Sequence, residues 1–331
     1  MDEAIVAGSL TKQYRNGVKA LAGVTFHIKQ GEIFGYLGRN GSGKTTTVRI
    51  LTGLTKPTSG KAQVAGYNLP SEASYVRSHI GVTLQEAALD DMLTASEHLV
   101  FIGGLWGLAS GQAKGRADEL LQQFGLTQSA DRRVGTFSGG MRRRLDIATA
   151  LIMRPQILFL DEPTTGLDPQ SRRALWGEIR ALRDDGATVF LTTQYLEEAD
   201  ELADKIAILN RGSIEALGTA AELKERFGTT SIKVQLSDSA DARRLRALVP
   251  DAAAVDEKGS ELSITLGPKD SSWDVLGRLH SAEVPVVSVS VREPSLEDVF
   301  VKLTGEEVEQ SGENAAGAAA TPAGAGAGAT A

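Results

Sequence analysis

The stretch "GEIFGYLGRNGSGKTTTVRI", residues 31–50, decides the fold of this chain. The apolar run before Gly38 predicts a buried strand, and the residues after Gly43 have the pattern of a helix. Between them, "GRNGSGKT" (38–45) fits the spacing G-x-x-x-x-G-K-[ST] of a phosphate-binding loop, in the strand–loop–helix context that this motif requires. Glycines let backbone N–H groups turn inward around a phosphate, and the helix N-terminus adds its positive dipole end. We therefore expect an α/β domain with a nucleotide site at this loop.

The residues of the loop are the first candidates for contact with the nucleotide. Lys44 can reach the β- and γ-phosphates, and the Thr45 hydroxyl can bind Mg²⁺. The alternative is a glycine-rich turn without a ligand, but a chance match in a chain of this length has a probability of about one in a hundred. The predicted nucleotide-binding residues of the loop are Gly38, Arg39, Asn40, Gly41, Ser42, Gly43, Lys44, Thr45 and Thr46.

Two carboxylates follow another apolar run, in "ILFLDEP" (157–163). Asp161 can hold Mg²⁺ through water, while the adjacent Glu162 points in a different direction and can polarise a water on the γ-phosphate. An acidic pair at a strand end is, in isolation, a helix cap or turn about half of the time. Because a phosphate loop precedes this pair, we interpret Asp161 as a metal ligand and Glu162 as a catalytic base.

A second anion site is predicted in "FSGGMRRRLDIATAL" (137–151). Ser138 is suited to cap a helix, and Gly139 and Gly140 leave backbone amides open at the helix start. One nucleotide does not need two such sites from one subunit, so the pattern suggests a nucleotide shared between two copies. The alternative is a glycine-rich cap with no ligand. Arg142–Arg144 crowd the positive end of the helix dipole; they either gain from phosphate or partner acids, or form a solvated basic face.

Composition excludes several classes of protein. The chain of 331 residues has a net charge of -7 and a pI of about 5.3, which argues against nucleic-acid binding by bulk electrostatics. It has no cysteine, so disulfides, zinc–thiolate sites and thiol catalysis are excluded, as suits a reducing compartment. "MDEAIVAGSL" has acidic residues where a signal peptide is basic. The longest uncharged apolar stretch (98–113) is too short to span a bilayer, so any membrane role is peripheral.

Patterns along the chain predict two domains. Residues 1–227 alternate apolar runs with helical patterns, which is typical of an α/β domain. Strand signals vanish at about 86–152, so a helical insert is expected there. "KIAILNRGSIEALG" (205–218) predicts a hairpin that turns at Arg211 and Gly212.

The pattern changes in residues 228–305, where short strands and helices in the order βαββαβ predict a small ferredoxin-like α+β domain. Its first helix is expected over "DARRLRAL" (241–248), and a helix over "SLEDVFVKLTG" (295–305) is expected to close it. The Ala/Gly-rich tail, 306–331, cannot bury a core and is expected to be disordered.

The three motifs, in this order, resemble those of the nucleotide-binding subunits of ATP-binding-cassette (ABC) transporters. The resemblance covers the first predicted domain. It implies that Tyr14 stacks on adenine, that Gln85 touches Mg²⁺ and the attacking water, and that Asp168 lies at a dimer seam. It also implies that Ser138–Gly140 contact the γ-phosphate bound by the opposite subunit. Met141 stands where the family most often has glutamine, but the Ser-Gly-Gly part that faces the phosphate is intact.

"LTTQYLEEAD" (191–200) departs from the family at one position. Most members have a histidine that contacts the γ-phosphate, whereas this chain has Gln194. Histidine titrates near neutral pH, but a glutamine amide has no useful pKa and can only donate and accept hydrogen bonds. Gln194 is therefore expected to position the γ-phosphate or the attacking water, which leaves Glu162 as the general base. This stretch, "LDEPTTGLDP" and "SLEDVF" are similar to daunorubicin/doxorubicin-resistance (DrrA-type) exporter ATPases.

The resemblance implies an ATP-hydrolysing subunit of an exporter, with ATP and Mg²⁺ as cofactors. Two copies would sandwich two ATP molecules as a homodimer, at the cytoplasmic face of the cell membrane, without nucleic acid. Separate integral-membrane permease subunits would bind the transported small molecule, a drug-like or hydrophobic compound. The helical insert is the expected permease contact, including Leu93, Phe101 and Trp106; the alternative, favoured for Trp106, is that these side chains form the core of the insert.

Three other functions compete with this expectation. A soluble ABC ATPase acting on DNA or the ribosome would show two cassettes, coiled-coil arms, zinc cysteines or a basic surface. In an importer ATPase the appended regulatory domain would more often be an OB barrel than βαββαβ. A non-hydrolysing regulator is disfavoured because Lys44 and Glu162 are both present.

Overall fold

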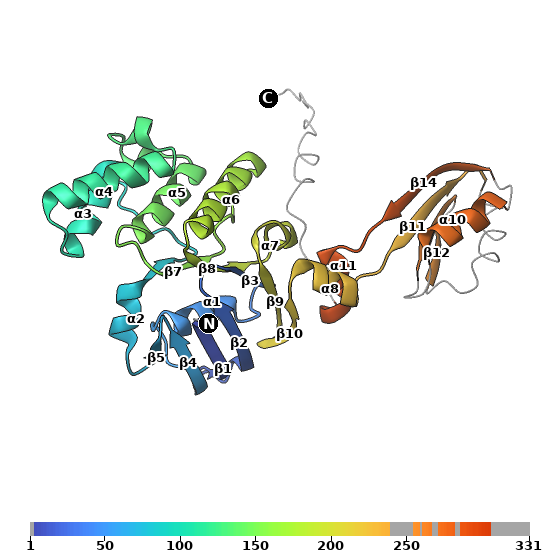
Figure 1. Cartoon of the computed structure of the whole chain (residues 1–331), viewed down its shortest axis with the longest axis horizontal. Coiled ribbons are helices and arrows are strands. Elements are labelled where there is room, and N and C mark those ends of the chain that lie inside the picture. Colours follow the sequence, from blue (N-terminus) through green and yellow to red (C-terminus); the bar gives the residue numbers. More distant parts are fainter. Residues whose placement is uncertain (1–2, 239–253, 259, 267–270, 282–284, 306–331) are drawn as a thin grey trace, which may run out of the picture.

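The computed structural model of the chain describes residues 3–238, 254–258, 260–266, 271–281 and 285–305. In this part of the chain no helix is both long and apolar enough to cross a membrane. Helices α3 (Ala95–Leu105) and α4 (Ser110–Gln123) lie at one end of the molecule, and a small sheet lies at the other end (Figure 1).

A six-stranded sheet forms the centre of the first domain. Its strands, in spatial order, are β10 (Ser213–Gly218), β9 (Lys205–Asn210), β3 (Ile33–Gly38), β8 (Thr188–Thr193), β7 (Ile157–Asp161) and β6 (Ile80–Thr83). All pairs are parallel except that of β9 with β10. Every residue of β3, β7 and β8 is buried, as expected for parallel strands that are covered on both faces. The carboxyl ends of the parallel strands meet at one edge, where α/β proteins bind ligands.

A second, antiparallel sheet was not predicted from the sequence. It consists of β2 (Lys19–Lys29), β1 (Glu3–Gln13), β4 (Ser59–Val64) and β5 (Tyr67–Leu69). The signal was present, because buried and exposed residues alternate in the second half of β2. Phe26 of this sheet stacks on Phe34 of the central sheet, with ring centroids 5.2 Å apart, so one aromatic core joins the two sheets.

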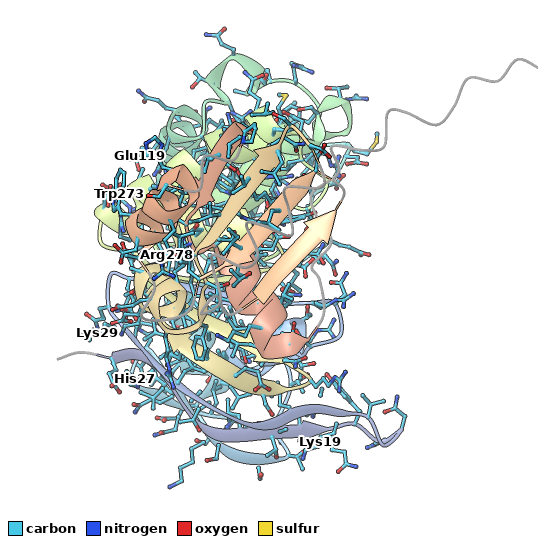
Figure 2. All side chains as sticks on the ribbon, turned by 90° about the vertical axis from the view of Figure 1, so that its right-hand side faces the viewer. Lys19, His27, Lys29, Glu119, Trp273 and Arg278 are labelled. Carbon is cyan, nitrogen blue, oxygen red and sulfur yellow. The ribbon has the colours of Figure 1, made fainter. Side chains whose placement is uncertain are left out.

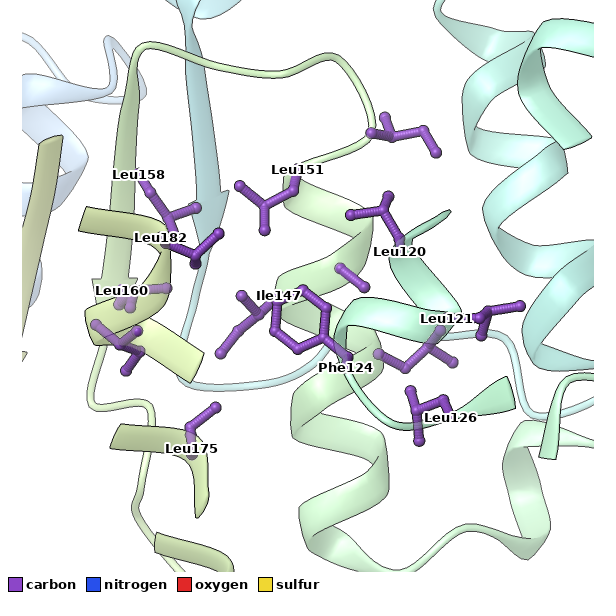
Figure 3. Packing of buried hydrophobic residues seen from close by; sticks show 14 of the residues in the cluster. Leu120, Leu121, Phe124, Leu126, Ile147, Leu151, Leu158, Leu160, Leu175 and Leu182 are labelled. Atoms are coloured by element: carbon purple, nitrogen blue, oxygen red, sulfur yellow. The ribbon is translucent and has the colours of Figure 1, made fainter. Parts of the chain in front are cut away.

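The helical insert is confirmed. It contains α3, α4 and α5 (Gly139–Ala150), with short 3-10 turns at Thr127–Ser129 and Val134–Thr136. Figure 3 shows that its core is shared with the central sheet and with α6 (Pro169–Asp184). The side chains labelled there are Leu120, Leu121, Phe124, Leu126, Ile147, Leu151, Leu158, Leu160, Leu175 and Leu182. The insert is therefore held against β7 through α5.

The prediction that Trp106 belongs to the core of the insert is wrong. Trp106 and Phe101 expose 50% and 55% of their surface, respectively, and Leu93 is half-buried. The core of the insert is filled by the other face of α3, which includes Leu99, and by α4.

The hairpin at 205–218 is confirmed. Strands β9 and β10 pair antiparallel, and Arg211 and Gly212 have φ values of +47° and +83°. Two left-handed residues at a two-residue turn are what the twist of a hairpin favours. Helix α8 (Ala220–Phe227) follows β10 and leads out of the first domain.

The small sheet has the predicted ferredoxin-like strand order. Its strands are β12 (Ala254–Lys258), β13 (Glu261–Thr265), β11 (Ser231–Leu236) and β14 (Val286–Arg292), in the order β12-β13-β11-β14 and all antiparallel. Helix α10 (Ser272–Ser281) packs on it through Val275. The helix predicted over 241–248 and the tail 306–331 lie outside the described residues.

The prediction that the last helix closes the small domain is wrong. Helix α11 (Leu296–Thr304) packs instead on α8 and on α7 (Leu196–Leu202), which belong to the first domain (Figure 1). Leu296, Val299 and Phe300 are buried there, because their spacing forms a helical stripe that matches the apolar face of α8 at Leu223. The small sheet is therefore attached to the first domain through two helices, α8 and α11.

Candidate functional site

The phosphate loop connects β3 to α1 (Lys44–Leu51). Gly43, which precedes α1, is left-handed with φ +112°, and a Cβ atom there would lie 2.5 Å from the carbonyl oxygen of Ala20. At Gly38 a Cβ atom would lie 2.6 Å from the carbonyl oxygen of Leu209. Both positions therefore require glycine, the first for its conformation and both for lack of space.

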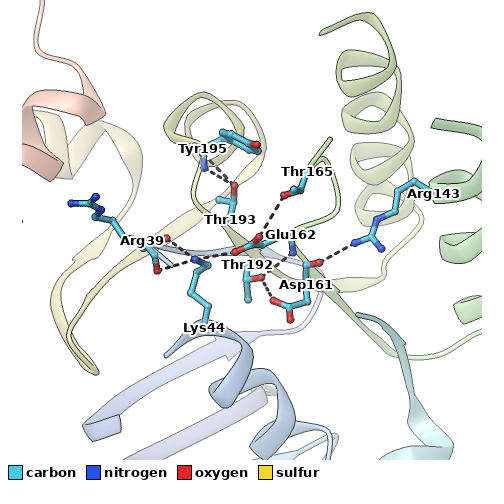
Figure 4. Close-up of polar contacts among 10 residues, drawn as sticks. Arg39, Lys44, Arg143, Asp161, Glu162, Thr165, Thr192, Thr193 and Tyr195 are labelled. Atoms are coloured by element: carbon cyan, nitrogen blue, oxygen red, sulfur yellow. Dashed lines mark hydrogen bonds and ion pairs between the residues drawn. The ribbon is translucent and has the colours of Figure 1, made fainter. Parts of the chain in front are cut away.

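Lys44 is buried inside this loop. Its Nζ donates hydrogen bonds to the carbonyl oxygens of Gly38 (2.7 Å) and Arg39 (3.1 Å), and it forms an ion pair with Glu162 Oε1 at 3.0 Å (Figure 4). Phosphate oxygens would therefore compete with the Glu162 carboxylate for one ammonium group. Thr45 follows in the first turn of α1, where it is half-buried.

Asp161 is fully buried at the end of β7. Its Oδ1 accepts a hydrogen bond from the Thr192 hydroxyl, but its Oδ2 has no hydrogen-bond partner within the described residues. A buried acceptor left without a partner costs about 1–3 kcal/mol. A cation or its bound water would satisfy Oδ2, so Asp161 fits the predicted metal-binding role.

The described residues contain no group of three or more His, Cys, Asp or Glu side chains that could hold a metal. The predicted ligands Thr45, Gln85 and Asp161 could therefore bind Mg²⁺ only together with water and nucleotide phosphates. That is the usual way in which Mg²⁺ is held at phosphate-transfer sites.

Glu162 has a strained backbone. Its φ is +49°, a left-handed conformation that costs a non-glycine residue about 1–2 kcal/mol. Its N–H donates to the carbonyl oxygen of Thr192 (3.1 Å) and lies 3.0 Å from the Thr192 hydroxyl, so β8 holds it in this conformation. The Glu162 carboxylate contacts Lys44 while that of Asp161 contacts Thr192, which confirms that the two carboxylates point in different directions (Figure 4).

Gln85 and Gln194 lie on either side of this pair. Gln85 follows β6 and is exposed, and Gln194 follows β8 and is half-buried. Since β6 and β8 are the two neighbours of β7 in the sheet, both glutamines are placed at the edge where Asp161 and Glu162 lie.

Tyr14 is brought to the loop by the antiparallel sheet. Its hydroxyl lies 3.3 Å from the Thr46 hydroxyl in the first turn of α1. About a third of its surface is exposed (36%), and the Lys12 ammonium lies 5.2 Å from the ring centroid. A partly exposed ring beside the phosphate loop is suited to stack on a nucleotide base.

The second predicted anion site, Ser138–Gly140, lies at the start of α5 and not at the phosphate loop of the same chain. Ser138 caps α5, where its hydroxyl accepts a hydrogen bond from the Met141 N–H at 3.3 Å, and Ser138 and Gly139 are exposed. Gly140 packs against Ser171 of α6. Helix α5, which begins at these residues, packs on α3, α4, α6 and β6, and this position fits a site that faces a second molecule.

Asp168 caps α6 at the surface. Its carboxylate accepts a hydrogen bond from the Ser171 N–H at 2.9 Å, and the hydrogen bonds from Ser171 lower its pKa. Asp168 is therefore an exposed, charged side chain next to the Ser138 site, whose Gly140 also packs on Ser171.

Arg143 has a role that sequence reasoning missed. It is 7% exposed, and its guanidinium donates to the carbonyl oxygen of Asp161 at 2.9 Å (Figure 4). It also donates to the carbonyl oxygens of Leu84 (2.8 Å) and Pro163 (2.9 Å). It thus links α5 to the ends of β6 and β7. The available signal was its spacing of three and four residues from the buried Gly140 and Ile147.

Of the two alternatives given for Arg142–Arg144, the structure supports partner acids, since Arg143 also pairs with Asp146 at 3.0 Å, and the solvated face is wrong for the buried Arg143. Arg142 forms an ion pair with Asp91, and Arg144 lies 3.9 Å from Glu178. These contacts are all within the chain.

Glu198 is a further buried acid that sequence reasoning missed. It lies in α7, four residues after Gln194, and its Oε1 accepts a hydrogen bond from Trp176 Nε1 at 3.1 Å. Burial raises its pKa, and the hydroxyls of Thr193 and Thr164 oppose this rise. The hydrogen bond between Glu198 and Trp176 therefore links α7 to α6, and it lies close in the chain to Gln194.

Comparison with known proteins identifies matches in both parts of the chain. A family model described as "ABC transporter" matches residues 21–165, and one described as "ATP-binding protein DrrA1-3-like, C-terminal domain" matches residues 218–304. The doxorubicin resistance ATP-binding protein DrrA of Mycobacterium tuberculosis is 43% identical over 316 residues, which covers 93% of this chain and 96% of that protein.

The daunorubicin/doxorubicin resistance ATP-binding protein DrrA of Streptomyces peucetius is 43% identical over 306 residues, which covers 91% of this chain and 92% of that protein. Among solved structures, a dimeric ATP-binding cassette in a post-hydrolysis state, bound to ADP and Pi, matches with a TM-score of 0.60 and 28% identity. That match covers 65% of this chain and 98% of the other.

Proposed function

The chain belongs to the ABC transporter family as an ATP-binding subunit, and from this premise we propose that it hydrolyses ATP to drive an exporter. The observation that carries the proposal is the meeting of Lys44, Asp161 and Glu162 at the carboxyl edge of the central sheet. Phosphoryl transfer to water requires a carboxylate that binds a cation, a second carboxylate and a lysine that binds phosphate.

Each predicted site residue has a proposed role. The backbone N–H groups of 38–46 and the Lys44 ammonium would hold the phosphates, and Tyr14 would stack on adenine. Thr45, Gln85 and Asp161 would hold Mg²⁺, which when bound neutralises charge on the phosphate oxygens. The orphaned Oδ2 of Asp161 and the position of the Tyr14 ring beside Thr46 support these assignments.

Glu162 is the proposed general base. Its carboxylate would accept the proton of the attacking water as the water oxygen bonds to the γ-phosphorus and the bond from that phosphorus to the leaving ADP oxygen breaks. The Glu162 carboxylate forms an ion pair with Lys44 at 3.0 Å, which has to break before Glu162 can accept a proton. Phosphate oxygens of the nucleotide would then take the place of the carboxylate beside the Lys44 ammonium. Gln194 would orient the water or the γ-phosphate from the neighbouring strand.

Two copies are proposed to act as a homodimer. The exposed Ser138 and Gly139, together with Asp168, would face the nucleotide held by residues 38–46 of the other copy. The similar cassette that is dimeric and bound to ADP and Pi supports this arrangement.

A membrane permease is the proposed partner. The exposed Phe101 and Trp106 on and after α3 support the helical insert as its contact surface. The chain would then lie at the cytoplasmic face of the cell membrane, and the permease would bind the transported compound. Relatives that confer doxorubicin or daunorubicin resistance favour a drug-like or hydrophobic compound. We also propose that the small domain begins after residue 227 and the tail after residue 305, with α11 packed back on the first domain.

Purification from native membranes tests the exporter proposal. The full-length chain, tagged and extracted in mild detergent, is expected to carry with it one polytopic membrane protein, identified by mass spectrometry. ATP hydrolysis by that complex is expected to change when drug-like compounds are added. Recovery of the chain in a soluble complex with nucleic acid, without a membrane protein, would contradict the proposal.

Replacement of Gln194 tests its positioning role. Gln194→Ala is expected to bind ATP as the wild type does but to hydrolyse it about 10²-fold more slowly, since one group that orients the reaction is lost. Gln194→His should keep activity, because histidine also donates and accepts hydrogen bonds. Gln122→Ala, an exposed glutamine on α4, is the matched control. If Gln194→Ala hydrolyses ATP at the wild-type rate, the residue is only a polar group at a strand end.

A further inference from the structure

The turn of the β9–β10 hairpin lies against the phosphate loop. The Gly212 N–H donates a hydrogen bond to the carbonyl oxygen of Ser42 at 3.0 Å. The Gly212 carbonyl oxygen accepts one from the Ala22 N–H at 2.8 Å. Since Ser42 belongs to the phosphate loop and Ala22 to β2, a single residue of the turn is bonded to both. The hairpin turn therefore joins the phosphate loop to the antiparallel sheet.

This junction has no room for a side chain on the turn. A Cβ atom at Gly212 would lie 2.8 Å from the carbonyl oxygen of Ala20, the same oxygen that a Cβ atom at Gly43 would approach to 2.5 Å. The carbonyl oxygen of Leu209, three residues before Gly212, excludes a side chain at Gly38 in the same way. Atoms that are not bonded do not approach so closely, so a larger residue would displace the backbone. The backbone of the hairpin and of β2 thus packs directly on the phosphate loop.

The hydrogen bond to Ser42 fixes the direction of the next N–H group in the loop. A peptide unit is planar and trans, so its C=O and N–H bonds point in opposite directions. Because the Ser42 carbonyl oxygen is held toward Gly212, the Gly43 N–H points toward the other side of the loop. Gly43 immediately precedes α1, and N–H groups at the start of a helix are the donors that bind phosphate. The turn therefore sets the orientation of a phosphate-binding donor.

We propose that Gly212 is a positioning residue for nucleotide binding, which aims the Gly43 N–H at a phosphate without touching the nucleotide itself. The inference deepens the proposed function and rests on it, because it requires a nucleotide at residues 38–46. A donor that is already oriented binds an anion more tightly than a mobile one, since less conformational freedom is lost on binding. Loss of the Gly212 contact should therefore weaken nucleotide binding and leave the carboxylates at the end of β7 in place.

A second turn of the same kind supplies a matched control. Ala65 and Gly66 connect β4 to β5 with φ values of +51° and +83°, close to the values of +47° and +83° at Arg211 and Gly212. A Cβ atom at Gly66 would have no atom of the described residues within 4 Å. Alanine at either glycine strains a left-handed backbone to the same extent. Only at Gly212 does it also collide with the junction described above.

Nucleotide affinity and turnover of the full-length variants Gly212→Ala and Gly66→Ala test the inference. For Gly212→Ala, Kd and KM for ATP are expected to rise about tenfold or more, as expected when one hydrogen bond to a charged group is lost. Its kcat at saturating ATP should stay within about twofold of the wild type, because the lost contact acts on binding. Gly66→Ala should match the wild type in all three quantities. Equal affinity of the two variants, or a fall in kcat with Kd unchanged, would overturn the inference.

Hydrogen exchange in the wild-type chain gives a test that does not depend on whether a variant folds. With ADP bound, peptides that cover residues 209–214 should exchange more slowly than without it, because a phosphate on the Gly43 N–H also steadies the Ser42 carbonyl group and its bond to Gly212. Peptides from the control turn, 64–68, should not change. Peptides from α10, which carries the exposed Trp273 (Figure 2), should not change either.

The exchange data separate this inference from the proposed function. Slower exchange at residues 38–46 with no change at 209–214 would refute the role of Gly212 and leave the nucleotide site standing. No response of either segment to ADP, together with no binding of ATP, would refute the proposed nucleotide site and this inference with it.

Discussion

Glu162→Gln is expected to lower the rate of ATP hydrolysis about 10²- to 10⁴-fold while ATP binding is retained. Gln85 and Gln194 at this edge have no useful pKa, and Asp161 is the proposed Mg²⁺ ligand, so Glu162 is the carboxylate left to take the proton of the water. The substitution also removes the charge that competes with phosphate for Lys44, so the affinity for ATP is expected to increase. Phosphate release and titration with a fluorescent ATP analogue measure the two effects.

Glu197→Gln is the control for this experiment. It makes the same chemical change at an exposed carboxylate of α7, and its rate should stay within about twofold of the wild type. With ATP, Glu162→Gln should also accumulate as a dimer in sedimentation, because the nucleotide is no longer consumed. Turnover by Glu162→Gln at the wild-type rate would show that Glu162 is not the base.

Arg143→Met is expected to lower the free energy of unfolding by about 3–5 kcal/mol, because it leaves buried polar groups without a partner. The carbonyl oxygens of Leu84, Asp161 and Pro163 lose their donor, and Asp146 loses its ion pair at 3.0 Å. Urea unfolding measures the loss.

The loss should depend on pH. Burial raises the pKa of Asp146 to about 6, although Arg143 opposes this rise, so the pKa should be higher still in Arg143→Met. A carboxyl whose folded-state pKa is raised stabilises the fold when it is protonated, and this contribution is lost as the pH rises through the folded-state pKa. Arg143→Met should therefore be less destabilised at pH 5 than at pH 8.

Arg180→Met provides the comparison. Arg180 also forms an ion pair, with Glu201 at 2.8 Å, but on the surface, so its loss should cost less than about 1 kcal/mol. Equal destabilisation by the two substitutions would contradict the anchoring role of Arg143.

The features that sequence predicted correctly are those carried by contiguous residues. The loop 38–45 and the hairpin at Arg211 and Gly212 depend on backbone conformations that a few neighbouring residues dictate. Asp161 was placed at a strand end because the five residues of β7 form an apolar run. In each case neighbouring residues set the local conformation, so the sequence pattern alone predicts the structure correctly.

The misses share another cause. The antiparallel sheet, the packing of α11 and the contacts of Arg143 all join residues that lie far apart in the chain. Arg143 reaches carbonyl groups 18, 20 and 59 residues away. Its charge at the positive end of a helix dipole suggested solvent, phosphate or partner acids, and only the fold shows that buried carbonyl groups bind it together with Asp146.

The sequence by itself determined that this chain binds a nucleotide phosphate, which carboxylates accompany that site, and that Gln194 cannot act as a base, because each follows from the chemistry of a short segment. Tertiary structure decided the rest. It placed Glu162 beside Lys44 and joined α5 to two strand ends through Arg143. Among the described residues it also left Asp161 Oδ2 without a partner and β14 at the edge of its sheet. Each of these features depends on which distant segments of the chain pack together, because polar groups become buried and paired only in the folded chain.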